Sequence, residues 1–331
     1  MRKIPAFVAV LAFFFSCGPK RYETTGHVER WDAALDVIIG PDATIDIIAK
    51  GFEWSEGPVW SSTQEELLFS DVPTNTVFAW REGEGLREYL RPSGFTGPAT
   101  DSREPGSNGL LINRAGKLIL CQHGNRAVAV MNAPLDSPAS DFLELASHYE
   151  GKRFNSPNDV AEDRQGNYYF TDPPYGLAAQ DQDPAKELSV NGVYRIDGRG
   201  TVTLLVDSLT RPNGLALSPD QTKLYVANSD PAKARWYEFV LRDSLVSAGR
   251  VLFDASDLTA TQNGLPDGLK VDSRGNIFAT GPGGVWIFDS SGKPLGKITL
   301  PEATSNCALS PDEKTLYVTN DGQVVRIRLR N

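Results

Sequence analysis

The feature that most constrains the fold of this chain is a motif that recurs six times. Each copy begins with a small residue or proline, followed by an acid or amide and usually by glycine and an apolar residue. Further along each copy comes an apolar or aromatic run that ends in a small or polar residue. The acid or amide of the six copies is Glu56, Asn108, Asn158, Asn213, Asp267 and Asn306.

Each copy predicts a small antiparallel sheet. Turn sequences such as 164–167 and 273–276 separate the two halves of a copy, and two short strands joined by such a turn form a hairpin. A third strand often follows, as at 192–196. The copies are 39 to 55 residues apart, which is the length of a four-stranded propeller blade with its loops.

We therefore expect an all-β fold, a six-bladed β-propeller that forms one domain over residues 43–331. Six sheets arranged radially bury their apolar faces against each other and protect their edges. The segment Ala43 to Ala49 has no copy of the motif before it, and it is predicted to supply the missing outer strand of the sixth blade.

The N-terminal segment predicts export and a lipid anchor. Arg2 and Lys3 precede a short apolar run, and Ser16-Cys17-Gly18 resembles the cleavage site of a bacterial lipoprotein. Residues 1–16 are then a signal peptide, and residues 17–42 are a lipidated Cys17 with a polar tether. This predicts a periplasmic or outer-membrane-anchored lipoprotein. An ordinary secretory signal and an uncleaved anchor are the alternatives.

The net charge limits the classes of binding partner, and the cysteine content limits the disulfides that we expect. The formal net charge of −9 argues against nucleic acid, and the lipid anchor is the one contact with a membrane that we expect. If Cys17 is acylated, Cys121 and Cys307 remain. They belong to the second and sixth copies, which are not neighbours in a ring of six, so we expect two buried thiols and no disulfide.

The six acid or amide residues predict a metal site. In a propeller the first strand of each blade runs beside the central channel, so these side chains form a ring near one mouth. All are oxygen donors, two are carboxylates and none is positive, which suits one calcium ion. Zinc, magnesium and manganese stay possible. The structural alternative is that they are turn residues, since Asn and Asp before Gly are common in turns. Glu56 is a poor turn residue.

Several longer motifs of the chain resemble a known family. They are residues 56–60, 153–160, 169–176, 211–214, 265–268 and 279–286. In sequence and order they are similar to those of the SMP-30, gluconolactonase and luciferin-regenerating enzyme-like proteins, especially the bacterial gluconolactonases. The resemblance implies a six-bladed propeller with one divalent ion, held by Glu56, Asn213 and Asp267, and Asn158 matches a further asparagine near the metal.

The resemblance also implies an activity, the hydrolysis of a small sugar lactone. A bound cation would polarise the carbonyl group, and Asp267 would accept a proton from water or act only as a ligand. Arg153 and Asn155 lie in the segment that resembles the substrate-contacting motif. Asn108 is predicted to face the substrate, and His123 to reach the channel mouth from the end of a blade strand.

Three other functions stay open at this stage. The same propeller and ion would also suit an organophosphate or an aryl ester, and strictosidine synthase-like propellers share the architecture. A lipid-anchored protein that only binds sugar or calcium is the non-enzymatic alternative. The sequence has no Gly-x-Ser-x-Gly elbow of a serine hydrolase. The stretch 178–190 predicts either a lid or a surface loop.

Overall fold

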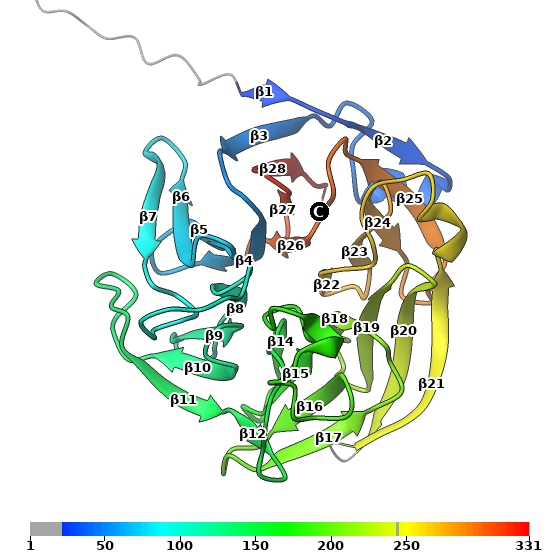
Figure 1. Cartoon of the computed structure of the whole chain (residues 1–331). Helices are drawn as coiled ribbons and strands as arrows, with labels where there is room; N and C mark the ends of the chain where they lie inside the picture. Colours follow the sequence, from blue (N-terminus) through cyan, green and yellow to red (C-terminus); the bar gives the residue numbers. More distant parts are fainter. Residues whose placement is uncertain (1–21, 243–244, 331) are drawn as a thin grey trace, which may run out of the picture.

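Every copy of the motif folds into one antiparallel sheet, and the six sheets surround a common axis (Figure 1). The computed structural model describes residues 22–242 and 245–330. The predicted six-bladed β-propeller is confirmed. The innermost strands of blades one to six are β4 (Ser55–Ser61), β8 (Ser107–Ile112), β14 (Val160–Glu162), β18 (Pro212–Leu217), β22 (Leu269–Val271) and β26 (Asn306–Leu309).

The other strands follow outward in chain order. Blades one to three continue with β5 (Glu66–Asp71), β6 (Thr76–Arg81), β7 (Gly85–Leu90); β9 (Leu118–Gln122), β10 (Ala127–Met131), β11 (Phe142–Ala146); and β15 (Tyr168–Asp172), β16 (Gly192–Ile196), β17 (Val202–Val206). Blades four to six continue with β19 (Lys223–Asp230), β20 (Lys233–Arg242), β21 (Leu245–Asp254); β23 (Ile277–Gly281), β24 (Gly284–Phe288), β25 (Pro294–Thr299); and β27 (Thr315–Asn320), β28 (Gln323–Arg328). A separate hairpin pairs β12 (His148–Tyr149) with β13 (Lys152–Arg153).

Helical structure in the described ranges consists of three short 3₁₀ helices. They are η1 (Ala33–Val37), η2 (Gln180–Gln182) and η3 (Ser256–Leu258). None of the helices in this part of the chain has the length and apolar character needed to cross a membrane.

The ring is closed by the beginning of the chain. The strand β3 (Ile45–Lys50) pairs with β28 on the outside of blade six, as predicted for this segment. The boundary at residue 43 is wrong, because residues 22–42 are part of the propeller. The strand β1 (Glu23–Thr24) pairs with β3, and β2 (His27–Arg30) pairs with β25 of blade five. The predicted signal peptide and Cys17 lie outside the described residues.

The polar character of residues 22–42 has a simple physical reason. These strands lie at the outer edges of their sheets, so few of their side chains are buried, and the sequence shows no long apolar run. Apolar residues of the same segment still pack on the blades. Leu35 is fully buried, and the ring of Trp31 lies 5.1 Å from that of Trp286.

The hydrophobic core is divided into six clusters, one at each junction between neighbouring blades. At the junction of blades six and one, for example, Trp80 packs near Tyr317 with their rings 6.3 Å apart. Cys121 belongs to the cluster between blades two and three, and Cys307 to the cluster between blades five and six. Both are buried free thiols, which confirms the prediction made for them.

Hydrogen bonds between blades fix the start of the inner strands. A Ser or Thr hydroxyl of one blade donates to a backbone carbonyl at or beside the acid or amide position of the next. These bonds are Ser70 to Asn108 (2.9 Å), Thr171 to Asn213 (2.6 Å), Thr280 to Ser305 (2.7 Å) and Ser305 to Ser55 (2.6 Å), together with one from Ser229 to Pro266. This explains why the second half of most copies ends in a small polar residue.

The glycine of the motif is required by the same close approach. A Cβ at Gly57, whose φ is +51°, would lie 2.0 Å from the carbonyl oxygen of Asn108. A Cβ at Gly214 would lie 2.3 Å from the carbonyl oxygen of Asp267. No real Cβ contact is this short, so neighbouring blades can meet at these points only through glycine.

The packing of η1 gives a test of whether residues 22–42 belong to the fold. Leu35→Ala removes a buried side chain from the cluster between blades five and six, and we expect the free energy of unfolding to fall by about 2–5 kcal/mol. Val37→Ala, in the same helix at an exposed position, is the control and should change it by no more than about 0.5 kcal/mol. Thermal or chemical denaturation measures both. Equal, small effects would show that this segment is not part of the folded unit.

Candidate active site

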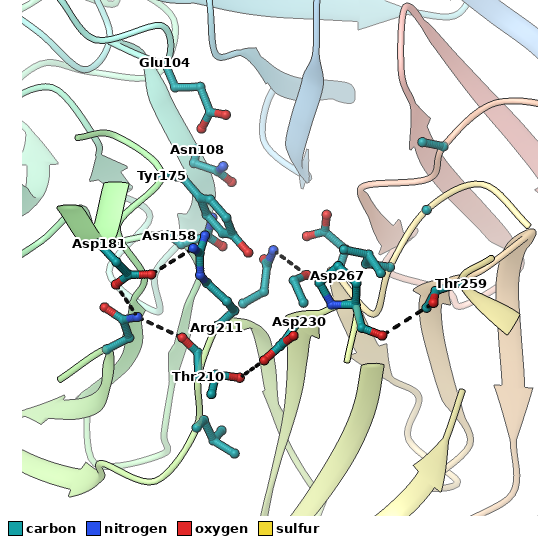
Figure 2. A pocket seen from close by; sticks show the side chains of 18 of the residues that line it. Glu104, Asn108, Asn158, Tyr175, Asp181, Thr210, Arg211, Asp230, Thr259 and Asp267 are labelled. Carbon is teal, nitrogen blue, oxygen red and sulfur yellow. Dashed lines mark hydrogen bonds and ion pairs between the residues drawn. The ribbon is translucent and has the colours of Figure 1, made fainter. Parts of the chain in front are cut away.

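A cavity of about 1160 Å³ lies over the central axis of the propeller. Five of the six acid or amide residues of the motif line it, each from a different blade. They are Glu56, Asn108, Asn158, Asn213 and Asp267 (Figure 2). The sixth, Asn306, does not border the cavity. The structure therefore brings together all four residues predicted to bind the metal, and Asn108 with them.

Four oxygen atoms of this ring have no hydrogen-bond donor among the described residues. They are the Oδ1 atoms of Asn108, Asn158, Asn213 and Asp267. An acceptor that is buried without a partner costs about 1–3 kcal/mol. Four such oxygens around one cavity match the oxygen-only ligation of a hard divalent cation such as calcium.

The two carboxyl groups of the ring strengthen this argument. Glu56 is buried, and its Oε2 accepts from the Gly57 amide (2.6 Å) and from Asn306 Nδ2 (3.2 Å). Burial raises the pKa of Glu56, and burial together with the Glu56 carboxyl raises the pKa of Asp267 well above its usual value. Neighbouring carboxylates at this depth favour either a shared proton or a bound cation. Among the described residues no three His, Cys, Asp or Glu side chains form a metal-binding group, so amides must complete any site here.

One positive charge lies next to the ring, which the sequence argument did not assign. The Nζ of Lys270 lies 3.7 Å from Asp159 Oδ2 and donates to Asn306 Oδ1 at 3.3 Å. Lys270 follows Asp267 in the same blade, and Asp159 follows Asn158. This pair therefore balances one further carboxylate near the ring. The side chain of Asn306, which does not border the cavity, is hydrogen-bonded to Lys270 and Glu56.

Two of the predicted substrate contacts lie away from the cavity. Arg153 borders a separate hollow of about 510 Å³ and donates to the carbonyl of Asn125 at 2.9 Å. Asn155 is fully buried, and its amide donates to the carbonyls of Asp172 (2.9 Å) and Val190 (3.0 Å). The motif was similar over its whole length, but Asn158 is the one residue of it that lines the cavity. The residues before it form the supporting loop.

His123 does not line the cavity either. Its side chain is fully buried, and its Nδ1 lies 3.2 Å from the carboxylate of Glu104, which does border the cavity. The loop that carries Glu104 starts after blade one and has no counterpart in the repeat. His123 therefore contacts a residue that lines the cavity without lining it itself.

Several lining residues were not assigned from the sequence, among them Glu104, Tyr175 and Arg211. Figure 2 shows them on the same side of the view as Asn108 and Asn158, with Asp267 on the opposite side of the site. Tyr175 and Arg211 both lie within motifs that had been noted for their resemblance. An arginine two residues before a ring asparagine was the available signal.

The stretch 178–190 borders the cavity through Asp181, Ser189 and Val190. It contains η2, and Asp181 forms an ion pair of 2.8 Å with Arg211. Most of its residues are exposed, as expected for a surface loop. The stretch forms part of one wall.

Comparison with known proteins decides the family. The sequence profile of the SMP-30/Gluconolactonase/LRE-like region matches residues 54–321. The chain belongs to this family. It is 40% identical to a gluconolactonase of Zymomonas mobilis over 314 residues, which cover 93% of this chain and 87% of that protein.

Solved structures agree with this assignment. A gluconolactonase from Xanthomonas campestris is 30% identical, with a TM-score of 0.80 over 95% of this chain and 99% of that one. A calcium-binding regucalcin from Agrobacterium tumefaciens shares the fold, with a TM-score of 0.67 at 16% identity over 86% of this chain and 94% of that one. The relationship to gluconolactonases supports the hydrolysis of a sugar lactone by this member of the family.

Asp172 supports the loop that presents Asn158. Its carboxylate accepts from the backbone amides of Asn155 (2.7 Å) and Ser156 (2.8 Å), and burial raises its pKa to about 7. Because this pKa lies above the value of an unfolded chain, the stabilising contribution is complete below about pH 4 and is lost as the pH rises to about 7.

Replacing this carboxyl tests the linkage. Asp172→Asn keeps one acceptor and cannot ionise, so at pH 5 it should be less stable than the parent by about 1–3 kcal/mol. The difference in the free energy of unfolding should shrink between pH 5 and pH 8, because only the parent loses stability over that range. Asp42→Asn, at an exposed carboxylate, is the control. A difference that stays constant with pH would contradict the assignment.

Proposed function

We propose that this protein hydrolyses a small sugar lactone with the help of one divalent cation, calcium, bound in the ring of the central cavity. The observation that carries this proposal is the set of four buried oxygens without donors, beside the buried carboxyl of Glu56. Its relationship to gluconolactonases, at 40% identity, supports the substrate class.

The residues that would hold the cation are Glu56, Asn158, Asn213 and Asp267. They supply two carboxylates and two amide oxygens, and calcium accepts six to eight oxygens, which leaves positions for water and substrate. When bound, the cation polarises the lactone carbonyl and stabilises negative charge on its oxygen. Asn108 borders the same cavity and is free to donate its amide to a substrate oxygen.

Hydrolysis also requires a group that accepts a proton. Water adds to the carbonyl carbon, the ring C–O bond breaks, and the products are a hydroxy carboxylate and one proton. Asp267 is our candidate for the base, because its carboxyl borders the cavity and has an oxygen without a donor. The alternative is that Asp267 only binds the cation.

The test is acid release from glucono-1,5-lactone by the full chain in detergent. We expect activity to disappear with a chelator and to return with calcium more fully than with magnesium, manganese or zinc. Asp267→Asn should lower kcat by about 100-fold or more if Asp267 is the base, because general-base catalysis contributes about 10²–10⁴-fold. Recovery of this variant in excess calcium would instead show a ligand role. Arg235→Met, in the outer strands of blade four, is the control.

Other outcomes favour the alternatives. A protein that binds calcium but releases no acid from lactones would contradict the lactonase proposal, and organophosphates and aryl esters would be tried next. If none of these is hydrolysed, a protein that binds sugar or calcium without catalysis is the remaining function.

We also propose that the protein is exported and anchored by a lipid at Cys17, in the periplasm or at the outer membrane. Support comes from the charged residues, apolar run and Ser16-Cys17-Gly18 of the N-terminal sequence. Since β1 begins at Glu23, such an anchor would hold the propeller close to the membrane surface.

Metabolic labelling with a fatty acid tests the anchor. In a Gram-negative host the parent should incorporate the label and partition into detergent, whereas Cys17→Ser should do neither. Cys121→Ala, at a buried thiol, should keep the label. An unlabelled parent that is secreted would indicate an ordinary signal, and an unlabelled parent that stays in the membrane would indicate an uncleaved segment.

A further inference from the structure

Arg211 is the one Lys, Arg or His among the described residues that line the central cavity. It stands directly before β18 and two residues before the ring residue Asn213. Six carboxyl groups line the same cavity: Glu56, Glu104, Asp181, Asp207, Asp230 and Asp267. A single positively charged side chain among six carboxyl groups needs an explanation.

The side chain of Arg211 is held from three sides. Its Nη2 pairs with Asp181 Oδ2 at 2.8 Å, its Nη1 donates to Gln180 Oε1 at 2.8 Å, and its guanidinium lies 5.7 Å from the centre of the Tyr175 ring. Figure 2 shows the Asp181 pair and the Tyr175 ring beside it. The side chain is still 26% exposed, and a guanidinium has five N–H groups. Arg211 therefore keeps donors for a ligand.

Asp181 is itself fixed. Its Oδ1 accepts from Asn191 Nδ2 at 3.0 Å, and the same amide donates to the carbonyl of Thr210 at 2.8 Å, next to Arg211. The wall segment 178–190 and the start of β18 are thus joined through Asn191 as well as through the ion pair. The pair is positioned before any ligand arrives, which is what orienting a substrate requires.

We propose that Arg211 orients the substrate by donating hydrogen bonds to its oxygens, and that Asp181 neutralises Arg211 so that the acid product is released. This inference rests on the proposed lactonase function. A lactone is uncharged and needs only N–H donors. Its product is an anion, and an unpaired arginine would bind the new carboxylate through two charge-assisted hydrogen bonds.

The competing explanation is purely structural. In that view the ion pair only attaches the segment 178–190 to blade four, and its loss lowers stability without changing how ligands bind. The two explanations predict different affinities for the anionic product, because the loss of a purely structural ion pair would not change that affinity selectively.

The experiment compares Asp181→Asn, Arg211→Lys and Arg211→Met with the parent, using the full calcium-loaded chain in detergent. The matched control is Arg235→Met, which breaks another 2.8 Å ion pair, with Asp254, of similar exposure on the outer strands of blade four. We measure kcat and KM for glucono-1,5-lactone, the inhibition constant of gluconate, and the melting temperature, at a constant concentration of free calcium.

We expect Asp181→Asn to bind gluconate about tenfold more tightly, because the charge of Arg211 is then unpaired. Arg211→Met should raise KM for the lactone about tenfold or more with a smaller change in kcat, and Arg211→Lys should lie between it and the parent. The double variant Asp181→Asn, Arg211→Met should lose the tighter binding of gluconate. An unchanged gluconate constant in Asp181→Asn, or variants that change only the melting temperature, would overturn the proposal.

The design separates this inference from the proposed function. If the parent hydrolyses no lactone, the lactonase proposal fails, and the gluconate arm is then measured by calorimetry. Tighter gluconate binding in Asp181→Asn that disappears in the double variant would still assign Arg211 to a ligand site. No difference between these variants would overturn the role of Arg211, whether or not the parent is active.

Discussion

The structure depends on hydrogen bonds that pass from one blade to the next at the start of the inner strands. A hydroxyl such as that of Thr171 donates to the backbone carbonyl of Asn213 in the following blade, and the glycine after the asparagine allows this approach. This hydrogen bond fixes the backbone of the asparagine and directs its side chain to the axis. The apolar clusters outside this ring hold the blades together, but they do not orient these side chains.

A chemical consequence follows from this arrangement. Because backbone carbonyls are used between blades, the side-chain oxygens of the ring are left to the cavity, where Asn108, Asn158 and Asn213 have no donor. Because these hydroxyl groups donate to backbone carbonyls, the unpaired side-chain oxygens of the ring are concentrated around the cavity. Charge is balanced in two ways: Lys270 pairs with Asp159 beside the ring, and Arg211 pairs with Asp181 on the wall.

The features that could be predicted from the sequence are those that the repeat marks. The blades, the ring residues and the closing strand β3 were all predictable, because six copies of one pattern constrain each other and a missing strand shows as a gap. Arg153 and Asn155 were assigned from a motif, and a motif does not show which of its residues face a cavity. Residues 22–42 were misassigned since edge strands bury little. Glu104 comes from a loop that occurs once, so no repeat marks it. Arg211 lies in a noted motif, but the repeat marks only the asparagine of that motif.

The pairing of β1, β2 and β3 has a consequence for biosynthesis. The partner of β3 is β28 and that of β2 is β25. The strands synthesised first can therefore pair only after the strands synthesised near the end of the chain. An unfinished chain can stack several blades, but the ring is not closed. The blades at its two ends then expose the apolar faces that a junction would cover. Completion of the ring is therefore an event of the finished polypeptide. Until then the chain stays open at the seam between blades six and one.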